Sequence, residues 1–432
     1  MLDIRFIRDN AKHVQEASQQ KGYQVDITHL LQLDDERREV LAKVESLRQK
    51  RNDIASRIKG GKPEPTVIEE GKKLKTELAE QEDRLRVLEE EYLTSLKKVP
   101  NMPMDDVPIG TSENENVIAK TWGEIPKFDF EPKNHWEIAE KRDWIDKERA
   151  AKVAGARFAY IKGDLALLWM ALVQFGFNVL TSEETLKKII ADAGLLNVSS
   201  KPFVPVLPPL MIRTEPYDMM DRLEPRDDRY KIEGDELWLQ GSAEHVLGSM
   251  HMQEILSEAD LPLRYVGYAT SFRQEAGTYG KDTEGIFRMH QFDKMEMESL
   301  TIPGQSFEEH LFMVAIQEYL MQQLELPYQV LQKCTADIGK PNARGIDIET
   351  WLPGQNNYRE THTADYMTDY QARRLQTRFR DTKGNLGLVH TNDATAFAQR
   401  PLIAIIENYQ NKDGTVRVPR VLQPYLGSRH TI

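Results

Sequence analysis

The sequence predicts an α+β protein in which two long N-terminal helices precede a domain built on an antiparallel sheet. Two observations lead to this prediction. Heptad patterns fill two stretches of the first hundred residues, and short alternating runs of polar and apolar residues recur after residue 200. Short strands that are separated by turns and interspersed with helices favour an antiparallel sheet.

The N-terminal helices are predicted from apolar residues that recur every three or four positions. One such seam occupies residues 33–58 and a second occupies residues 74–99. Between them, residues 60–65 read Gly-Gly-Lys-Pro-Glu-Pro, the clearest turn signal in the chain. Two heptad helices, at about 28–59 and 66–99, should therefore pack antiparallel as a coiled-coil arm.

Composition changes along the chain suggest its division into domains. We expect an N-terminal domain at 1–103, a linker at 104–133 that is rich in Pro, Asp, Asn and Gly, and a second domain at 134–432. Within the second domain, alternating patterns predict strands at 203–207, 237–240, 286–292, 346–351 and 386–390.

Length, charge and cysteine content restrict the class of protein. A chain of 432 residues suits two or three domains, and no run of eighteen apolar residues suggests a membrane span. Cys334 is the single cysteine, so an internal disulfide and a Cys-rich zinc site are excluded and a cytoplasmic location is the simplest expectation. The net charge of −12 argues against a generic nucleic-acid binder, so any RNA site must be a local patch.

The half of the arm nearest its turn carries such a local basic patch. Its basic residues include Arg48, Lys50, Arg51, Arg57, Lys59, Lys72, Lys73 and Lys75. Acidic residues dominate toward the other end of both helices. A solvated coiled-coil surface explains this pattern, and so does contact with RNA phosphates; the composition alone favours the first explanation.

Residues 270–296, TSFRQEAGTYGKDTEGIFRMHQFDKME, concentrate the groups needed to hold a nucleotide. The pattern predicts a strand that ends near Arg273, a glycine-rich loop, and a returning strand that contains Arg288 and Phe292. Two arginines and an aromatic ring on one sheet face suit a triphosphate and a flat base. A β-hairpin with solvated charges is the alternative.

This segment resembles motif 2 of the class II aminoacyl-tRNA synthetases, and in detail that of the seryl-tRNA synthetases. Their pattern is Phe-Arg-x-Glu, a loop, and then Arg-x-His-Gln-Phe-x-Lys-x-Glu. Every fixed member is present, as Phe272, Arg273, Glu275, Arg288, His290, Gln291, Phe292, Lys294 and Glu296. The resemblance implies a class II catalytic domain at 134–432 and a tRNA-binding N-terminal arm.

Two further segments extend the resemblance. Residues 239–244 are similar to the Thr-x-Glu loop that holds the amino acid in this family, with Ser242 where threonine is usual and Glu244 available for the substrate ammonium. A helix N-cap at Ser242 is an alternative role. Residues 202–209 place prolines around a short strand and resemble motif 1, which forms the dimer interface in the family; a proline-rich edge loop is the alternative.

The segment Glu360-Thr361-His362-Thr363 stands where family members have Glu-Ile-Ser-Ser, and residues 369–374 read Asp-Tyr-Gln-Ala-Arg-Arg close to the family pattern. The resemblance implies that Glu360 binds Mg²⁺ and ATP and that Thr363 supplies the hydroxyl of that site. Residues 362–366 depart from the usual serines and asparagine.

Motif 3 corresponds to residues 390–400, which are one residue shorter than the family pattern His-Thr-Leu-Asn-x-Ser followed by Arg. Two registers are therefore open. In the first, Asn392 takes the place of the family asparagine; in the second, Asp393 replaces it and Thr395 takes the hydroxyl position. Arg400 is kept in both.

The resemblance implies an enzyme that converts serine and ATP to seryl-adenylate and transfers the seryl group to tRNA(Ser), with tRNA(Sec) as a further acceptor. It implies ATP and Mg²⁺ as ligands, a homodimer, and no membrane partner. We expect no zinc, because His290, His362 and His390 are irregularly spaced and lack a companion cysteine.

The implied site residues fall into four groups. They are the catalytic residues Arg273, Arg400 and Glu360; the ATP-binding residues Arg273, Glu275, Arg288, Phe292, Glu360, Thr363 and Arg400; the serine-binding residues Ser242, Glu244, Arg273, Glu296, Asn392 and Thr395; and the Mg²⁺ ligands Glu360 and Thr363. The basic residues of the arm are the implied tRNA contacts.

Two rival functions remain. A ligase that loads a small amino acid onto a carrier protein fits the motifs, but its known representatives lack a long arm. A non-catalytic RNA-binding homologue is disfavoured, because Arg273, Glu360 and Arg400 are all kept.

Overall fold

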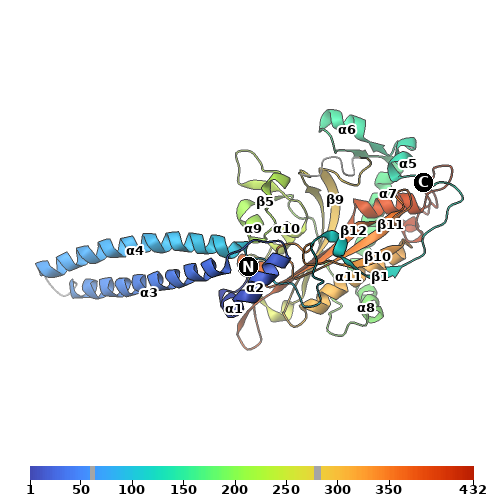
Figure 1. Ribbon diagram of the computed structural model, residues 1–432. Helices are drawn as coiled ribbons and strands as arrows, with labels where there is room; N and C mark the ends of the chain where they lie inside the picture. Colours follow the sequence, from blue (N-terminus) through green and yellow to red (C-terminus); the bar gives the residue numbers. More distant parts are fainter. Residues whose placement is uncertain (59–63, 277–283) are drawn as a thin grey trace. The chain divides into compact units, whose positions relative to one another are not determined.

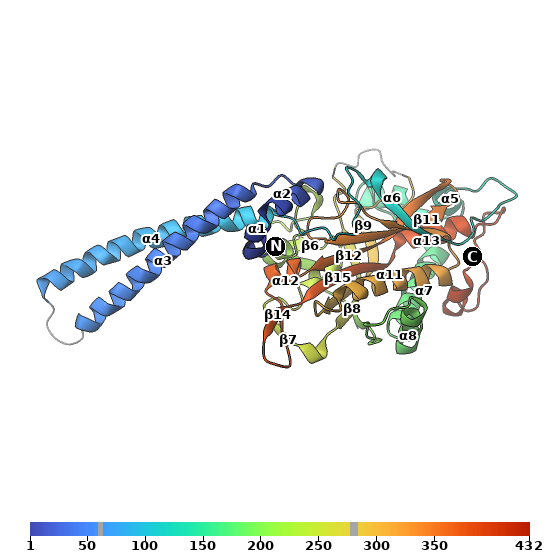
Figure 2. The same ribbon diagram turned by 60° about the horizontal axis from the view of Figure 1, so that its bottom comes forward.

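The computed structural model describes residues 1–58, 64–276 and 284–432, and the chain divides into two compact units at Met1–Met102 and Pro103–Ile432. The first unit is helical (Figures 1 and 2). Its helices are α1 (Ile4–Asp9), α2 (Ala11–Gln20), α3 (Ile27–Ile58) and α4 (Pro65–Lys98). The predicted bounds of the two long helices are confirmed to within one residue where the structure describes them.

The heptad seam holds α3 and α4 together as a hairpin (Figure 2). Its apolar positions are buried; from α3 they include Val40, Val44 and Leu47, and from α4 Leu74, Leu78 and Leu85. Arg48 on α3 and Glu82 on α4 are 2.8 Å apart across the hairpin. Because the two helices bury a continuous apolar seam, their remaining faces stay polar and exposed.

Asp34 anchors the start of the arm. Its carboxylate is fully buried and lies within 2.9 Å of guanidinium nitrogens from Arg8, Arg37 and Arg38. Burial acts to raise the pKa of Asp34, but the hydrogen bonds from Arg37 and Arg8, together with the charges of Arg38 and Arg37, lower it overall. This buried cluster ties α1 to the first turns of α3.

An eight-stranded sheet forms the centre of the second unit, in the order β1-β10-β11-β12-β15-β9-β8-β4. Its strands are β1 (Val117–Trp122), β4 (Val204–Val206), β8 (Leu263–Phe272), β9 (Gln291–Thr301), β10 (Tyr328–Gln332), β11 (Arg344–Leu352), β12 (Asn357–Thr368) and β15 (His390–Ala398). All neighbours run antiparallel except β4 and β8, which are parallel. The predicted antiparallel sheet is confirmed.

Three helices, all labelled in Figure 2, pack on one face of this sheet: α7 (Gly163–Leu180), α11 (Ser306–Gln323) and α13 (Gln399–Asn408). Their buried side chains share one core with Met295, Met297 and Ala394 of the central strands. By length and composition α7 could cross a membrane, but more than half of it is buried in this core.

Smaller elements complete the unit. They are α5 (His135–Lys141), β2 (Ile145–Asp146), α6 (Lys147–Val153), β3 (Tyr160–Ile161), α8 (Glu183–Asp192), β5 (Met211–Arg213), α9 (Thr214–Met219), β6 (Leu237–Leu239), α10 (Glu244–Gly248), β7 (Ile255–Ser257), α12 (Tyr370–Leu375), β13 (Arg378–Arg380) and β14 (Leu386–Leu388). On the face of the sheet opposite α7, α11 and α13, α10 packs against β8, with Leu247 and Ala243 over Ala269. Gly267 permits this approach, because a Cβ there would lie 2.8 Å from Leu247.

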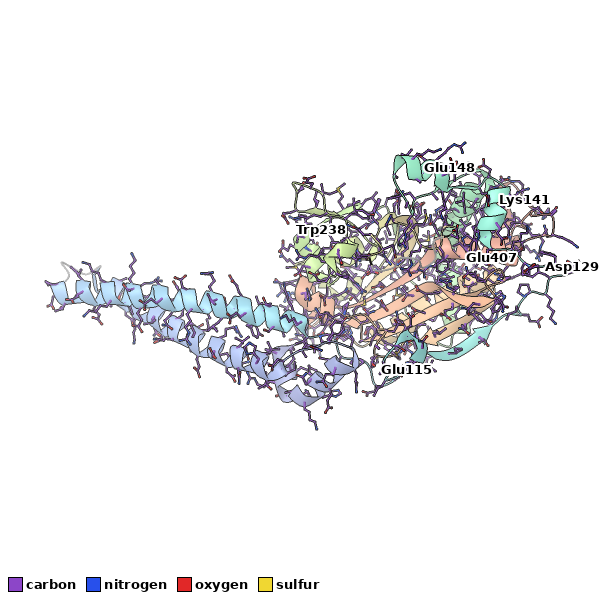
Figure 3. All side chains as sticks on the ribbon, turned by 45° about the horizontal axis from the view of Figure 1, so that its top comes forward. Glu115, Asp129, Lys141, Glu148, Trp238 and Glu407 are labelled. Atoms are coloured by element: carbon purple, nitrogen blue, oxygen red, sulfur yellow. The ribbon has the colours of Figure 1, made fainter. Side chains whose placement is uncertain are left out.

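Glu407, labelled in Figure 3, joins three distant segments at the end of α13. Its buried carboxylate accepts hydrogen bonds from the His135 backbone nitrogen at 3.0 Å and from Gly354 at 2.9 Å. Position 354 also has to be glycine for a steric reason, because a Cβ there would lie 2.6 Å from the backbone of Asn134. Glu407, near the end of α13, therefore holds the turn between β11 and β12 in place.

Two expectations about chain organisation are wrong. The segment 104–133, expected as a linker, contributes β1, which pairs with β10 at the edge of the large sheet. The predicted strand at 286–292 begins only at Gln291 and continues to Thr301. Its first part does not pair as a strand, because β8 ends at Phe272 and offers no ladder opposite it.

Candidate active site

One cavity in the second unit gathers most of the residues singled out from the sequence. It lies over the ends of β8, β9, β12 and β15 and the start of α13. Its lining comprises Arg273, Glu275, Ile286, Phe287, Arg288, Met289, Phe292, Lys294, Glu360, Thr361, Thr363, Thr395, Ala398, Gln399 and Arg400. The structure thus brings Arg273 and Arg400, which are 127 positions apart in the chain, to the same cavity.

Arg273 follows the last residue of β8 and is held by two contacts. Its Nε donates to the backbone oxygen of Gly241 at 3.0 Å, and its guanidinium faces the ring of Phe292 at 5.3 Å. Arg273 also lines the cavity, and only its Nε is used in the bond to Gly241, so the guanidinium is oriented and can still bind an anion.

Arg288 and Glu275 form an ion pair on the wall of this cavity. The Nη1 atom of Arg288 is 2.6 Å from Oε2 of Glu275. Glu275 has a φ of +54°, which turns its side chain back toward the segment that returns after the loop. Arg288 therefore lies on the segment that leads into β9, and not on the strand that the sequence pattern predicted.

Arg400 begins the first turn of α13 and meets Glu360 of β12. Its Nη1 donates to Glu360 twice, to Oε2 and to the backbone oxygen, both at 3.0 Å. The ring of Phe287 lies 4.7 Å from the Arg400 guanidinium and 4.0 Å from that of Arg359. Phe287 thus supports two arginines. The sequence reasoning missed this role, although the residue lies within the motif 2 segment.

Oxygen ligands for a hard cation lie beside this pair. Glu360 and Thr363 both line the cavity, and Thr363 is opposite Asp347 on the neighbouring strand β11. Asp347 is buried, and its Oδ1 has no hydrogen-bond partner among the described residues. A carboxylate, a hydroxyl and a further buried carboxyl oxygen match the donor set that Mg²⁺ prefers.

Lys294 connects the cavity to a second, deeper group of polar residues. Its Nζ lies 2.6 Å from Oε2 of Glu296 and donates to Oγ of Ser242 at 3.3 Å. Glu244 is close by, since its carboxyl oxygen lies within 4.8 Å of those of Glu296 and Asp393. The structure therefore brings Ser242, Glu244 and Glu296 together, as the resemblance implied.

The alternative N-cap role of Ser242 is wrong. The residue that caps α10 is Ala243, and no side chain makes the capping hydrogen bond. The hydroxyl of Ser242 instead accepts from Lys294, which leaves it in the polar group beside the cavity.

The strand β15 decides between the two motif 3 registers, because adjacent residues point to opposite faces of a sheet. Asn392 donates from Nδ2 to the backbone oxygen of Ser306 on α11, on the far face. Asp393 lies 3.4 Å from Arg222, and Thr395 lines the cavity. The assignment of Asn392 to the serine site is therefore wrong, and the register with Asp393 and Thr395 fits.

Arg222 is a member of this polar group that the sequence analysis missed. Its Nε lies 2.8 Å from Glu244, and its Nη2 lies 3.4 Å from Asp393 and 3.7 Å from Asp365. Its partners follow it by 22, 171 and 143 positions. No local pattern could have revealed contacts over such separations.

Burial raises the pKa values of two buried acids in this part of the site, Glu296 and Asp393. It raises the pKa of Glu296 to about 7, although Lys294 acts in the opposite direction. Burial and the nearby carboxylate of Glu244 raise the pKa of Asp393 well above its usual range, against the effect of Arg222. A set of buried carboxyls that interact in this way is typical of a functional site.

The basic residues of the arm belong to the first unit and line none of this cavity. Lys50, Arg51, Lys72, Lys73 and Lys75 are exposed, whereas Arg48 pairs with Glu82 across the hairpin. The side chain of Arg57 and all of Lys59 lie outside the described residues. The structure places the exposed members on the half of the arm nearest its turn.

A test of the buried acids follows from the pKa of Glu296. The folded protein keeps a proton that the unfolded chain loses near pH 4.5, so this group makes stability fall as pH rises toward 7. We expect Glu296→Gln to gain stability relative to the wild type as pH increases from about 5 to 8, as measured by urea unfolding. Exposed Glu131→Gln is the control. If the free energy of unfolding of Glu296→Gln changes with pH in parallel with that of the wild type, the raised pKa of Glu296 is contradicted.

Comparisons with known proteins agree with this geometry. Residues 1–103 match the model of the seryl-tRNA synthetase N-terminal domain, and residues 228–409 match that of the class II tRNA synthetase core domain (G, H, P, S and T). The chain is 41% identical to the serine–tRNA ligase of Thermodesulfovibrio yellowstonii over 438 residues, covering 99% of both chains. It is 37% identical to that of Nitrosopumilus maritimus over 441 residues, covering 100% of both chains.

Solved structures give the same result. The seryl-tRNA synthetase of Pyrococcus horikoshii, complexed with ATP, superposes with a TM-score of 0.87 at 37% identity, covering 100% of this chain and 99% of that one. The cytoplasmic serine–tRNA ligase of Naegleria fowleri, in complex with AMP, superposes with a TM-score of 0.83 at 27% identity, covering 100% and 98%. The chain therefore belongs to the seryl-tRNA synthetase family of class II aminoacyl-tRNA synthetases.

Proposed function

We propose that this protein activates L-serine with ATP and transfers the seryl group to tRNA(Ser). The observation that carries the proposal is the convergence of Arg273, Arg400 and Glu360 on one cavity, next to the buried polar group around Glu296. The family relationship, and the ATP and AMP bound by the similar solved structures, support the choice of nucleotide.

In the first step, a carboxylate oxygen of serine attacks the α-phosphorus of ATP. The bond from that phosphorus to the oxygen bridging to the β-phosphate breaks, and pyrophosphate leaves with the electron pair. Arg273 holds the α-phosphate and the serine carboxylate together, while Arg288 and Arg400 hold the γ-phosphate end. Preorganised positive charge of this kind stabilises the crowded transition state without a protein nucleophile.

The remaining cavity residues position the base and the cation. Glu275 contacts the adenine amino group, and the ring of Phe292, backed by Arg273, stacks on the base. Glu360 and Thr363 would hold Mg²⁺, which supplies neutralisation of phosphate charge when bound. The deeper residues Ser242, Glu244 and Glu296 take the ammonium and hydroxyl of serine.

In the second step, a ribose hydroxyl at the 3′ end of the tRNA attacks the carbonyl carbon of the adenylate. AMP leaves and takes the hydroxyl proton on its phosphate. The exposed basic residues of α3 and α4 bind the tRNA backbone, because ammonium and guanidinium groups neutralise phosphates irrespective of sequence. A carrier-protein ligase would have no use for such an arm.

We also propose a homodimer that forms through the open edge of the sheet. The edge strand β4 carries Val204, and Leu207 and Met211 follow it; all three apolar side chains are exposed. An unpaired edge with exposed apolar residues suits association with a second copy. Analytical ultracentrifugation at micromolar concentration should give twice the chain mass, and Leu207→Glu should reduce it to that of a monomer.

The proposed activity is tested by ATP–pyrophosphate exchange with each of the twenty standard amino acids. Serine alone should support exchange, and Arg400→Ala should lower kcat/KM by about 100-fold or more, because one preorganised charge is removed. Exposed Arg380→Ala should leave the rate unchanged. Exchange with a different amino acid, or with none, would overturn the proposed function.

Deletion of the arm separates activation from tRNA transfer. The guanidinium of Arg37 lies 4.6 Å from the ring of Tyr92 across the hairpin, so the two helices are neighbours here, and a glycine linker that spans their separation can replace residues 38–91. We expect this variant to retain serine-dependent exchange while aminoacylation of tRNA(Ser) falls by several orders of magnitude. The same assay with tRNA(Sec) tests the second acceptor.

Point variants provide a matched control for the deletion. Replacing Lys72, Lys73 and Lys75 with alanine should raise KM for tRNA several-fold and lower the salt dependence of binding by roughly one unit for each phosphate-binding lysine removed. Replacing the exposed acids Glu89, Glu90 and Glu91 of the same helix should do neither. If exchange and aminoacylation were reduced equally, the proposal that the arm binds tRNA and takes no part in serine activation would be contradicted.

A further inference from the structure

The two stretches that depart from the family pattern meet in the folded protein. Asp365, in the stretch 362–366, pairs on β12 with Asp393 of β15, which stands where the family pattern has asparagine. On the next strand, Glu298 of β9 lies opposite Asp393. Three buried carboxyls thus form a row across the sheet, and Arg222 contacts two of them.

This row forms the far end of the amino-acid site. Lys294, Glu296 and Glu298 alternate along one face of β9, and Lys294 lines the nucleotide cavity. Glu296 is opposite Thr395, which lines the cavity, and Glu298 and Asp393 lie one step further along the strands. The side chains converge, because the carboxyl oxygens of Glu244, Glu296 and Asp393 all lie within 4.8 Å of one another. An amino acid whose carboxylate reaches Arg273 therefore directs its other groups toward these acids.

The polar atoms that remain in this group are acceptors. Arg222 contacts Glu244 and Oδ2 of Asp393, and Lys294 contacts Oε2 of Glu296. Oε1 of Glu296, both oxygens of Glu298 and Oδ1 of Asp393 have no hydrogen-bond partner among the residues that the structure describes. With Asp365, which Arg222 also contacts, five carboxyls surround the two cations Arg222 and Lys294, and buried acceptors without donors are costly.

Position 393 holds aspartate where the family pattern has asparagine, and this difference also adds hydrogen-bond acceptors to the group. An asparagine amide presents two N–H donors and one acceptor oxygen, whereas an aspartate that is ionised beside a bound cation presents only acceptors. A serine hydroxyl can donate one hydrogen atom to this group. An ammonium in the same position would donate three, and its positive charge would favour ionisation of the carboxyls whose pKa values burial has raised.

We propose that the site also binds and activates a serine-sized amino acid with a second ammonium in place of the hydroxyl, L-2,3-diaminopropionate. The inference rests on the proposed function, because the activation step is the same. A carboxylate oxygen of the diamino acid attacks the α-phosphorus, and pyrophosphate leaves with the electron pair. Asp393 is the specificity-determining residue, with Glu296 and Glu298 as the further acceptors of the added ammonium.

A divalent cation fits this group less well, although the oxygens of Glu244, Glu296 and Asp393 are close enough to share one. Arg222 already lies 2.8 Å from Glu244, and Lys294 lies 2.6 Å from Glu296. A dication would be placed within a few ångströms of two fixed positive charges, whose repulsion in a buried site is strong. A bound diamino acid is repelled less strongly by Arg222 and Lys294. Its side chain carries a single positive charge, and rotation of the side chain allows that charge to change its position.

ATP–pyrophosphate exchange with the full chain tests the inference, with serine, L-2,3-diaminopropionate and alanine as substrates. We expect kcat/KM for the diamino acid to lie within about tenfold of that for serine, and that for alanine to be at least 100-fold lower. Asp393→Asn should lower the ratio of diamino acid to serine by about tenfold or more, the effect of one charge-assisted hydrogen bond. Exposed Asp129→Asn, labelled in Figure 3, is the matched control and should keep the wild-type ratio.

The outcomes separate this inference from the proposed function. Exchange with serine but none above the alanine level with the diamino acid overturns the inference and leaves the proposed function intact. Exchange with neither overturns both. An unchanged ratio in Asp393→Asn overturns the role of Asp393. If thermal unfolding shows that Asp393→Asn does not fold, the same ratio is measured for Glu298→Gln. The comparison of the diamino acid with alanine in the wild type still tests the inference.

Discussion

A charged side chain can be buried on a sheet only where an opposite charge or a hydrogen-bond partner reaches it, and this requirement organises the larger unit of the protein. The central strands are buried on both faces. One face packs Met295 and Met297 against α7, α11 and α13, whereas the other presents Lys294 and Glu296. The ion pairs on that second face hold its charges in fixed positions, and the same fixed charges are what a nucleotide and an amino acid require.

Contacts with neighbouring residues also explain why the arginines of the cavity can still bind anions. Arg273 is oriented by the backbone of Gly241, and Arg400 by Glu360, so each guanidinium is positioned by part of its surface only. Phe287 and Phe292 support these groups from the side through their ring faces. An arginine that is restrained before the ligand arrives loses less entropy on binding, and this favours catalysis by positioning.

The helical unit illustrates a different use of charge. The seam between α3 and α4 is apolar, so its outer faces are free to carry charges with little effect on stability. Only some of the basic residues are used in ion pairs across the hairpin, such as Arg48 with Glu82. The exposed lysines near the turn can therefore serve phosphate binding without any conflict with the packing of the arm.

Much of the structure could be predicted from local patterns, and the failures have a common cause. The long helices, the strands at 204–206 and 237–239, and the grouping of Arg273 with Arg400 agree with the sequence analysis. The pattern at 286–290 alternates like a strand, yet a strand also needs a partner, and β8 has ended before it. The segment 117–122 falls within the predicted linker, because composition does not reveal a pairing with β10 that bridges more than 200 positions.

By itself, the sequence determined the family motifs, their order, the arm, and the identity of the groups that face a nucleotide, because these depend on residue type and short spacings. Tertiary structure alone decided which of Asn392 and Asp393 faces the amino-acid site, since a shift of one residue along a strand moves a side chain to the opposite face. It alone also assembled Arg222 with Glu244, Asp365 and Asp393. Contacts between residues far apart in the chain depend on how the strands are arranged, and no local spacing records that arrangement.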